Sequence, residues 1–137
     1  MIVMVSHGVY LLDTDICIAL LKKDTNVADR FRKAGAHNCK ISNISLAELY
    51  FGAYKSGKRN HFIDISEIMN LMEQYPINSL RKYGEIRWFL ESKGLKIGDM
   101  DTFIAATALE KNLILVTGNT KHFNRVPGLL FENWMKQ

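Results

Sequence analysis

The chain has 137 residues, of which 47% are hydrophobic and 23% are charged. This length suits one domain that can bury a core, so we expect a single domain over residues 1–137, and the ordinary composition excludes disordered and fibrous proteins. The net charge of +4 permits binding to nucleic acid without requiring it, because small basic clusters are also typical of solvated helix faces.

Two features of the sequence indicate where in the cell the protein acts. The apolar runs at residues 9–12 and 16–21 are too short to cross a membrane, and no basic segment precedes them as in a signal peptide. The two cysteines, Cys17 and Cys39, form neither a disulfide framework nor a zinc motif. We therefore expect a cytoplasmic protein that does not bind membranes.

Strands and helices alternate in the predicted chain order. Residues 9–12 predict a strand that ends at Asp13, and the following segments predict helices over 16–21 and 26–34, a strand over 39–42 and a helix over 44–56. A longer helix is predicted from about residue 61 to 75, where Pro76 ends it, and a brief strand near Ile77 follows. Helices over 80–92 and 101–111 and strands over 113–116 and 129–131 complete the pattern.

This alternation predicts an α/β fold with a central parallel sheet flanked by helices. In such sheets, ligands bind beyond the carboxyl ends of the strands, where the strand order reverses. Four side chains belong to segments that end or begin at this edge: Asp13, Glu48, Asp101 and Asn119. Carboxylates that share one cleft repel one another unless a cation neutralises them, and Mg²⁺ or Mn²⁺ prefers oxygen ligands.

A structural role is the alternative for each acid taken singly. Asp13 and Asp99 suit the N-cap of a helix, and Asp101 suits the positive end of a helix dipole. Three separate segments with an acid at one edge favour a metal site for Asp13, Glu48 and Asp101, whereas Asp99 is expected to cap its helix beside the cleft. Ser45 lies one turn before Glu48 and shares its helix face.

Other chemistries lack a motif. The four histidines show no metal-ligand spacing and are expected at the surface, and Cys17 is expected in the core. Neither a glycine-rich nucleotide loop nor a G-x-S-x-G serine motif is present. A phosphoacceptor signalling domain would need a lysine after a late strand, where this chain has Thr117-Gly118-Asn119.

Four segments together resemble the PIN-domain ribonucleases, and among them the VapC toxins of bacterial toxin–antitoxin pairs: YLLDTDICI, ISNISLAELYFGAYKS, IGDMDTFIAATALEKNLILVTGNTKHF and VPGLLFENW. The resemblance implies a PIN-like three-layer fold and matches Asp13, Glu48 and Asp101 to the family's metal-binding acids. Asn119 matches a fourth position that is often aspartate, and a carbonyl oxygen can still ligate there. The number of bound metals stays open.

The resemblance also implies a reaction, in which a water activated by Mg²⁺ hydrolyses an RNA phosphodiester bond. Thr14 and Thr117 match polar positions that line the cleft, and Asp15 stands where the family frequently has asparagine. Whether Asp15 or Glu48 orients the water stays open. The alternative function is a non-catalytic RNA- or protein-binding PIN-like module, which the neutral Asn119 favours.

The family further implies a homodimer and a VapB-like antitoxin. Two groups of apolar side chains could form a groove for an amphipathic partner helix: Tyr50, Phe51 and Tyr54, and the stripe Phe62, Ile65, Met69 and Met72. The stripe is equally well explained as part of the core. The stripe is therefore expected either to bind a partner or to pack in the core.

Overall fold

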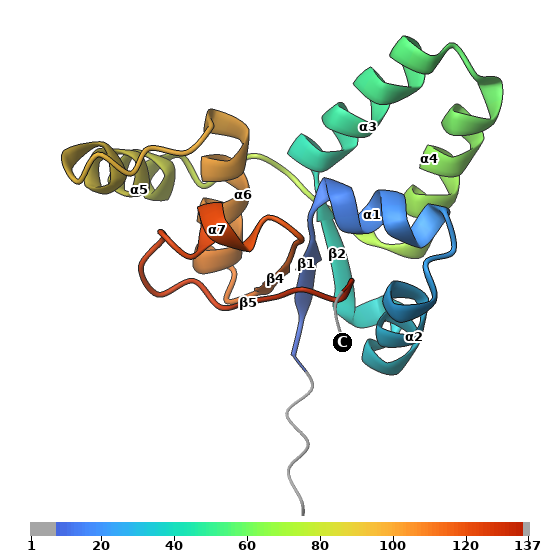
Figure 1. Cartoon of the computed structure of the whole chain (residues 1–137), viewed down its shortest axis with the longest axis horizontal. Helices are drawn as coiled ribbons and strands as arrows, with labels where there is room; N and C mark the ends of the chain where they lie inside the picture. The colour runs from blue at the N-terminus through green and yellow to red at the C-terminus, as the bar shows by residue number, and fades with distance from the viewer. Residues whose placement is uncertain (1–7, 136–137) are drawn as a thin grey trace, which may run out of the picture.

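Five parallel strands form one sheet between two layers of helices in the computed structural model, which describes residues 8–135 (Figure 1). The predicted α/β class is thereby confirmed. The elements, in chain order, are β1 (Tyr10–Leu12), α1 (Thr14–Leu21), α2 (Thr25–Ala34), η1 (Ala36–Asn38), β2 (Cys39–Ser42), α3 (Asn43–Ser56), α4 (Arg59–Leu71), β3 (Glu73–Tyr75), α5 (Leu80–Ser92), α6 (Asp99–Glu110), β4 (Ile114–Val116), α7 (Thr120–Phe123) and β5 (Phe131–Glu132).

The strand order is β3-β2-β1-β4-β5, and each neighbouring pair is parallel. Tyr10 of β1 pairs with Cys39 of β2 on one side and with Ile114 of β4 on the other. The first strand, β1, lies in the middle of the sheet; β2 and β3 extend the sheet to one edge, and β4 and β5 are added on the opposite side of β1. The order reverses between β1 and β4, so their carboxyl ends border the crevice where ligands bind in such folds.

The core has two apolar layers, one on each face of the sheet. Leu11 and Leu12 are adjacent in β1 and fully buried, and their side chains enter opposite layers because successive strand residues point to opposite faces. Helices α1 to α4 cover the Leu12 side, and α5 to α7 cover the Leu11 side (Figure 1). Burial on both faces explains why the central strands are continuous apolar runs without alternation.

Three elements differ from the predicted ones. The helix predicted to reach residue 75 ends at Leu71, and Glu73–Tyr75 forms β3, so the strand predicted near Ile77 is wrong. Residues 73–75 carry mostly exposed side chains and become a strand because their backbone pairs with β2. Neither η1 nor α7 was predicted, and the last strand begins at Phe131 rather than at residue 129.

The apolar stripe on α4 and just after it belongs largely to the core. Ile65 and Met72 are buried, and Phe62 and Met69 are partly buried against the same layer. Tyr50, Phe51 and Tyr54 on α3 are exposed instead. The explanation as core therefore holds for the stripe, whereas the three α3 aromatics remain an accessible surface.

No helix within the described part of the chain is both long and apolar enough to span a membrane. Cys17 and Cys39 are free thiols, and both are buried. Cys17 lies in the layer beneath α1 to α4, as predicted.

Candidate active site

Asp13 joins the ends of β1 and β4. Its backbone N–H donates to the carbonyl oxygen of Val116 at 2.9 Å, its Oδ1 accepts from the Thr14 backbone N–H at 2.8 Å, and its Oδ2 accepts from Thr117 Oγ1 at 2.9 Å. Asp13 is thus the N-cap of α1 and at the same time faces the crevice between β1 and β4. The capping role predicted for Asp13 is thereby confirmed, and its role as a metal ligand stays a prediction.

Asp15 lies at the same crevice, in the first turn of α1. Its Oδ2 accepts from the Gly118 backbone N–H at 2.9 Å. Its Oδ1 is buried and has no hydrogen-bond partner within residues 8–135. A buried carboxylate oxygen without a partner is costly, so this atom calls for a further ligand.

The protonation of these acids reflects their surroundings. Burial, followed by the charge of the neighbouring Asp15, raises the pKa of Asp13 to about 7. Burial also raises the pKa of Asp15, and the charge of Asp101 acts in the same direction on both groups. The crevice therefore disfavours three ionised carboxylates in the absence of a compensating positive charge.

Glu48 is tied to the site through Thr14, whose Oγ1 donates to Glu48 Oε1 at 2.6 Å. This bond connects the first turn of α1 to α3. Ser45 is buried one turn earlier on α3, where its backbone N–H donates to Ser42 Oγ at 3.2 Å. The Ser45 hydroxyl has no hydrogen-bond partner among the described residues.

His122 adds a side chain that the sequence reasoning set apart from the site. Its Nδ1 lies 2.8 Å from Asn119 Nδ2 and 3.4 Å from Asp101 Oδ2. The Asn119 backbone N–H also donates to Thr117 Oγ1 at 3.0 Å. The available signal was the spacing from Asn119, because residues three apart meet on one face once α7 forms.

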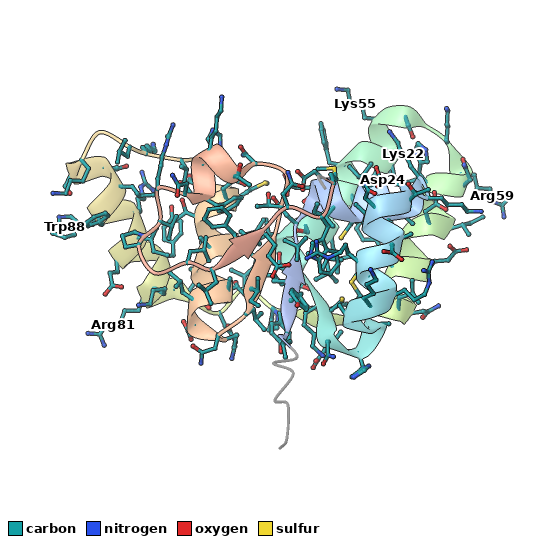
Figure 2. All side chains as sticks on the ribbon, turned by 60° about the horizontal axis from the view of Figure 1, so that its bottom comes forward. Lys22, Asp24, Lys55, Arg59, Arg81 and Trp88 are labelled. Atoms are coloured by element: carbon teal, nitrogen blue, oxygen red, sulfur yellow. The ribbon has the colours of Figure 1, made fainter. Side chains whose placement is uncertain are left out.

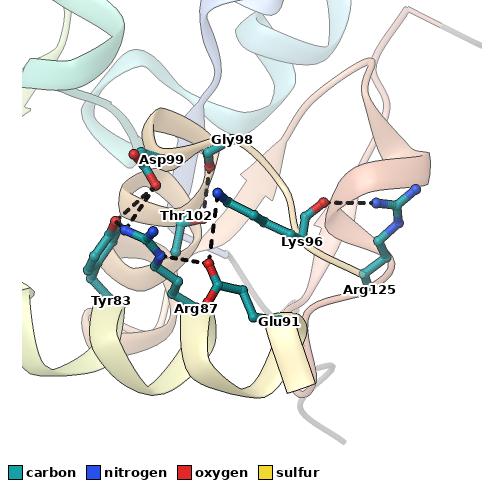
Figure 3. Close-up of polar contacts among 8 residues, drawn as sticks. All are labelled: Tyr83, Arg87, Glu91, Lys96, Gly98, Asp99, Thr102 and Arg125. Atoms are coloured by element: carbon teal, nitrogen blue, oxygen red, sulfur yellow. Dashed lines mark hydrogen bonds and ion pairs between the residues drawn. The ribbon is translucent and has the colours of Figure 1, made fainter. Parts of the chain in front are cut away.

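Asp99 faces away from this group, and its predicted capping role is wrong. Gly98 is the N-cap of α6, and Asp99 is its first residue, without a side-chain capping bond. Its Oδ1 accepts from the Tyr83 hydroxyl at 2.9 Å and lies 3.6 Å from Arg87 Nη1, so it connects α6 to α5 (Figure 3). The Tyr83 ring stacks on Phe103, with centroids 4.1 Å apart, which places the hydroxyl beside Asp99.

The donor chemistry suits a divalent cation. The oxygens of Asp13, Asp15, Glu48 and Asp101 are hard ligands, and the unpartnered Asp15 Oδ1 supplies a free donor. In residues 8–135 as they stand, however, no three Asp, Glu, His or Cys side chains are close enough to form a complete metal cluster. Ligation would therefore require side-chain adjustment, such as release of Glu48 from Thr14.

Comparison with known proteins identifies the family of this chain. The PIN domain family model matches residues 10–129. The chain is 38% identical to "Ribonuclease VapC2" of Rickettsia felis, over 93% of this chain and 99% of that protein. It is 36% identical to "tRNA(fMet)-specific endonuclease VapC" of Salmonella typhimurium, over 91% of this chain and 97% of that protein.

The fold of a solved complex agrees as well. The structure of VapBC2 from Rickettsia felis bound to a DNA fragment from its promoter superposes with a TM-score of 0.85 at 37% identity, covering 91% of this chain and 98% of that chain. The family match over residues 10–129, the curated relatives and the solved structure agree with one another. The chain belongs to the PIN-domain family and, within it, to the VapC ribonucleases.

Proposed function

We propose that this chain is an endoribonuclease that hydrolyses RNA phosphodiester bonds and acts as the toxin of a VapBC-type toxin–antitoxin pair. One observation carries the proposal: Asp13, Asp15 and Asp101 approach one another at the carboxyl ends of β1 and β4, where burial and mutual repulsion raise the pKa of the first two. The names of the relatives, ribonuclease and endonuclease, favour an enzyme over the non-catalytic binding module.

PIN-domain ribonucleases generally depend on a divalent metal ion. We infer that the ion here is Mg²⁺, for which Mn²⁺ can substitute, and that Asp13, Glu48 and Asp101 hold it. When bound, such an ion lowers the pKa of water and neutralises charge on the phosphoryl oxygens. Asn119 is neutral, and its side chain hydrogen-bonds with His122. The metal site therefore has one charged ligand fewer than it would have with an aspartate at this position.

The surrounding residues hold these acids in place. Thr117 Oγ1 and the Thr14 backbone N–H orient the Asp13 carboxylate, and Thr14 Oγ1 restrains Glu48. The Gly118 backbone N–H fixes one oxygen of Asp15 and leaves the other free for a ligand. The protein supplies no nucleophile in this scheme, so its residues act by orienting a water and the scissile phosphate.

The partners and the compartment follow from the same assignment. A VapB-like antitoxin is the expected protein partner, because similar solved structures are VapBC complexes. A homodimer, a single domain over residues 1–137 and action in the cytoplasm, where RNA is present and free thiols stay reduced, complete the proposal.

The test uses the purified, antitoxin-free chain and total bacterial RNA, with Mg²⁺, with Mn²⁺ or with a chelator. Discrete fragments that need metal and disappear in both Asp13→Asn and Asp101→Asn are the expected result. RNA that stays intact under every condition, although the chain binds metal, would overturn the nuclease and leave the binding module. Fragments that persist in both variants would show a contaminating nuclease.

A further inference from the structure

Some lysine and arginine side chains form ion pairs with carboxylates, and others have none among residues 8–135. Cations on α2, β2 and α5 form ion pairs with nearby carboxylates, among them Arg30 with Glu132 at 2.9 Å and Lys40 with Glu73 at 2.8 Å. Ten Lys and Arg side chains have no carboxylate within 4.0 Å among residues 8–135. Five of them are Arg81, Lys93, Lys111, Lys121 and Arg125, and the other five are Lys22, Lys23, Lys55, Lys58 and Arg59. The last five are all exposed.

The last five of these cations lie on neighbouring segments at one end of the molecule. Lys22 and Lys23 follow α1, Lys55 lies in the last turn of α3, Lys58 is the N-cap of α4 and Arg59 is its first residue. Figure 2 shows Lys22, Lys55 and Arg59 at the same end, with Arg81 and Trp88 at the opposite end. We call this set of five residues the α3–α4 basic rim. Because like charges repel, the rim is a surface that a polyanion would stabilise.

The α3–α4 basic rim adjoins Glu48 along one face of α3. Lys55 follows Glu48 by nearly two helical turns, which places both on the same face about 10 Å apart along the helix axis. Glu48 and Lys22 line one pocket of about 280 Å³ between α1, α3 and α4. Asp64 is a second carboxylate in this lining. The pocket therefore joins Glu48 of the site to Lys22 of the rim.

Gly52 keeps this face open. It lies one turn after Glu48 in the middle of α3 and also lines the pocket. A Cβ atom built at Gly52 would meet nothing within 4 Å, so packing within the chain does not demand glycine there. Glycine weakens a helix interior, and its presence leaves an unobstructed surface between Glu48 and Lys55.

An exposed aromatic ring accompanies the cations. Tyr54, which is 76% exposed, precedes Lys55, and its ring packs edge-on against Phe62 with centroids 5.0 Å apart. A supported ring that is open to solvent beside unpaired cations is the combination with which proteins hold single-stranded nucleic acid. An acidic peptide would use the cations but has no comparable need for a free aromatic face.

From these features we infer that the α3–α4 basic rim binds the backbone phosphates of single-stranded RNA on one side of the cleavage point, with Tyr54 stacking against a base. This inference rests on the proposed function, because it takes RNA to be present at Glu48. It assigns a direction to the substrate, which leaves the acids of the site along α3 toward the α3–α4 turn.

The experiment separates binding from cleavage. Affinity for a short fluorescein-labelled single-stranded RNA is measured by anisotropy over a range of salt concentrations, in the full chain carrying Asp101→Asn. The rim variant combines Lys55→Gln, Lys58→Gln and Arg59→Gln. Its matched control combines Arg81→Gln, Lys93→Gln and Lys111→Gln, which removes the same charge from exposed cations that also have no ion pair with any described residue.

The rim variant is expected to bind more weakly and to reduce the slope of log affinity against log salt by about 0.7 for each lost phosphate contact. The control variant should keep the slope. Equal slopes in the two variants would overturn the inference. Binding of polyglutamate to the unsubstituted chain but not to the rim variant, together with unchanged RNA binding, would overturn it too and assign the rim to an acidic protein segment.

A second pair of variants tests the open face without changing charge. Gly52→Leu should weaken RNA binding severalfold while leaving the melting temperature unchanged or higher, since leucine favours a helix. Gly84→Leu on α5, where an added Cβ also meets nothing within 4 Å, should leave RNA binding unchanged. Undiminished binding by Gly52→Leu would contradict the proposed route.

The same rim substitutions in the chain with Asp101 intact test the link to cleavage. A raised KM with an unchanged kcat is the expected result, because the rim holds RNA away from the reacting bond. If the chain cleaves no RNA at all, the proposed function fails, whereas the anisotropy result still decides whether the rim binds RNA. An unchanged KM in a chain that does cleave would contradict the inference alone.

Discussion

The Tyr83 hydroxyl donates a 2.9 Å hydrogen bond to Oδ1 of Asp99, and Arg87 Nη1 donates to the same hydroxyl at 2.9 Å. This chain of bonds joins α5 to the first turn of α6, which also carries Asp101 (Figure 3). Two aspartates that are neighbours in the sequence therefore have different surroundings. Asp99 connects α6 to α5, whereas Asp101 faces the crevice.

This difference predicts opposite outcomes when each of the two aspartates is replaced by asparagine. Asp99→Asn should keep most of the RNA cleavage activity, because Asp99 does not face the acids of the site. Asp101→Asn should lose about 100-fold or more, as expected when a charged group that acts on the reacting centre is removed. Single-turnover cleavage rates measure both. A severe loss in Asp99→Asn at unchanged fold, checked by circular dichroism, would contradict the assignment.

Removal of the Tyr83 hydroxyl tests the helix contact itself. Tyr83→Phe keeps the stacking on Phe103 and deletes two hydrogen bonds, the one donated to Asp99 and the one accepted from Arg87. The free energy of unfolding should therefore fall by about 1–2 kcal/mol. Urea denaturation measures this change. A loss several times larger would show that the bond network contributes cooperatively.

The pH dependence of stability should reveal Asp13. Burial and the nearby Asp15 raise its pKa in the folded chain to about 7, whereas the unfolded chain keeps an ordinary value near about 4. The folded state then binds the proton more tightly, so the free energy of unfolding decreases as pH rises between these two values. Above about pH 7 this contribution stays constant.

Urea denaturation of the chelator-treated protein at pH 5.5 and pH 8 measures this effect. The unsubstituted chain should lose free energy of unfolding between pH 5.5 and pH 8, and this loss should exceed the loss in Asp13→Asn by on the order of 1–4 kcal/mol. At pH 8, Asp13→Asn should be the more stable chain, and Mg²⁺ should stabilise only the unsubstituted one. Identical pH profiles for the two chains would contradict the raised pKa.

Gly118 should tolerate no side chain. A Cβ there would run into Met135 Cε and would lie 2.6 Å from Asp15 Oδ2. Gly118→Ala should therefore displace the Asp15 carboxylate, lower the melting temperature and reduce cleavage. The matched control is Gly84→Ala, which meets open space within α5 and should gain roughly 0.5–1 kcal/mol of stability. Thermal melts and cleavage rates of both variants distinguish a local clash from a general effect.

The two thiols should be unreactive in the folded chain. Cys17 and Cys39 are fully buried, burial raises the pKa of the Cys17 thiol, and it raises the pKa of Cys39 to about 12. Thiolates are the reactive form, so a thiol reagent at pH 8 should label neither residue until the chain unfolds. The labelling rate should therefore rise with urea concentration, as the fraction of unfolded chain rises. Rapid labelling of the native chain would contradict this burial.

Much of the fold could be predicted because local patterns carry it. The apolar runs at residues 9–12 and 113–116 predicted the central strands, and the buried strands β1 and β4 lie there. The helix periodicity failed at residues 73–75, where pairing with β2 outweighs the apolar repeat that continues to Met72. Such an edge strand has no local signal, since its stability comes from a distant segment.

For the candidate site, the sequence by itself determined which segments supply an acid at the carboxyl edge of the sheet, because strand ends are local and parallel strands share that edge. Only the tertiary structure decided which side chains meet. It turned Asp99 toward Tyr83, brought His122 to Asp101, and set Gly118 against Asp15. Those contacts depend on the strand order and on the rotation of each helix about its axis, which packing across the whole sheet determines.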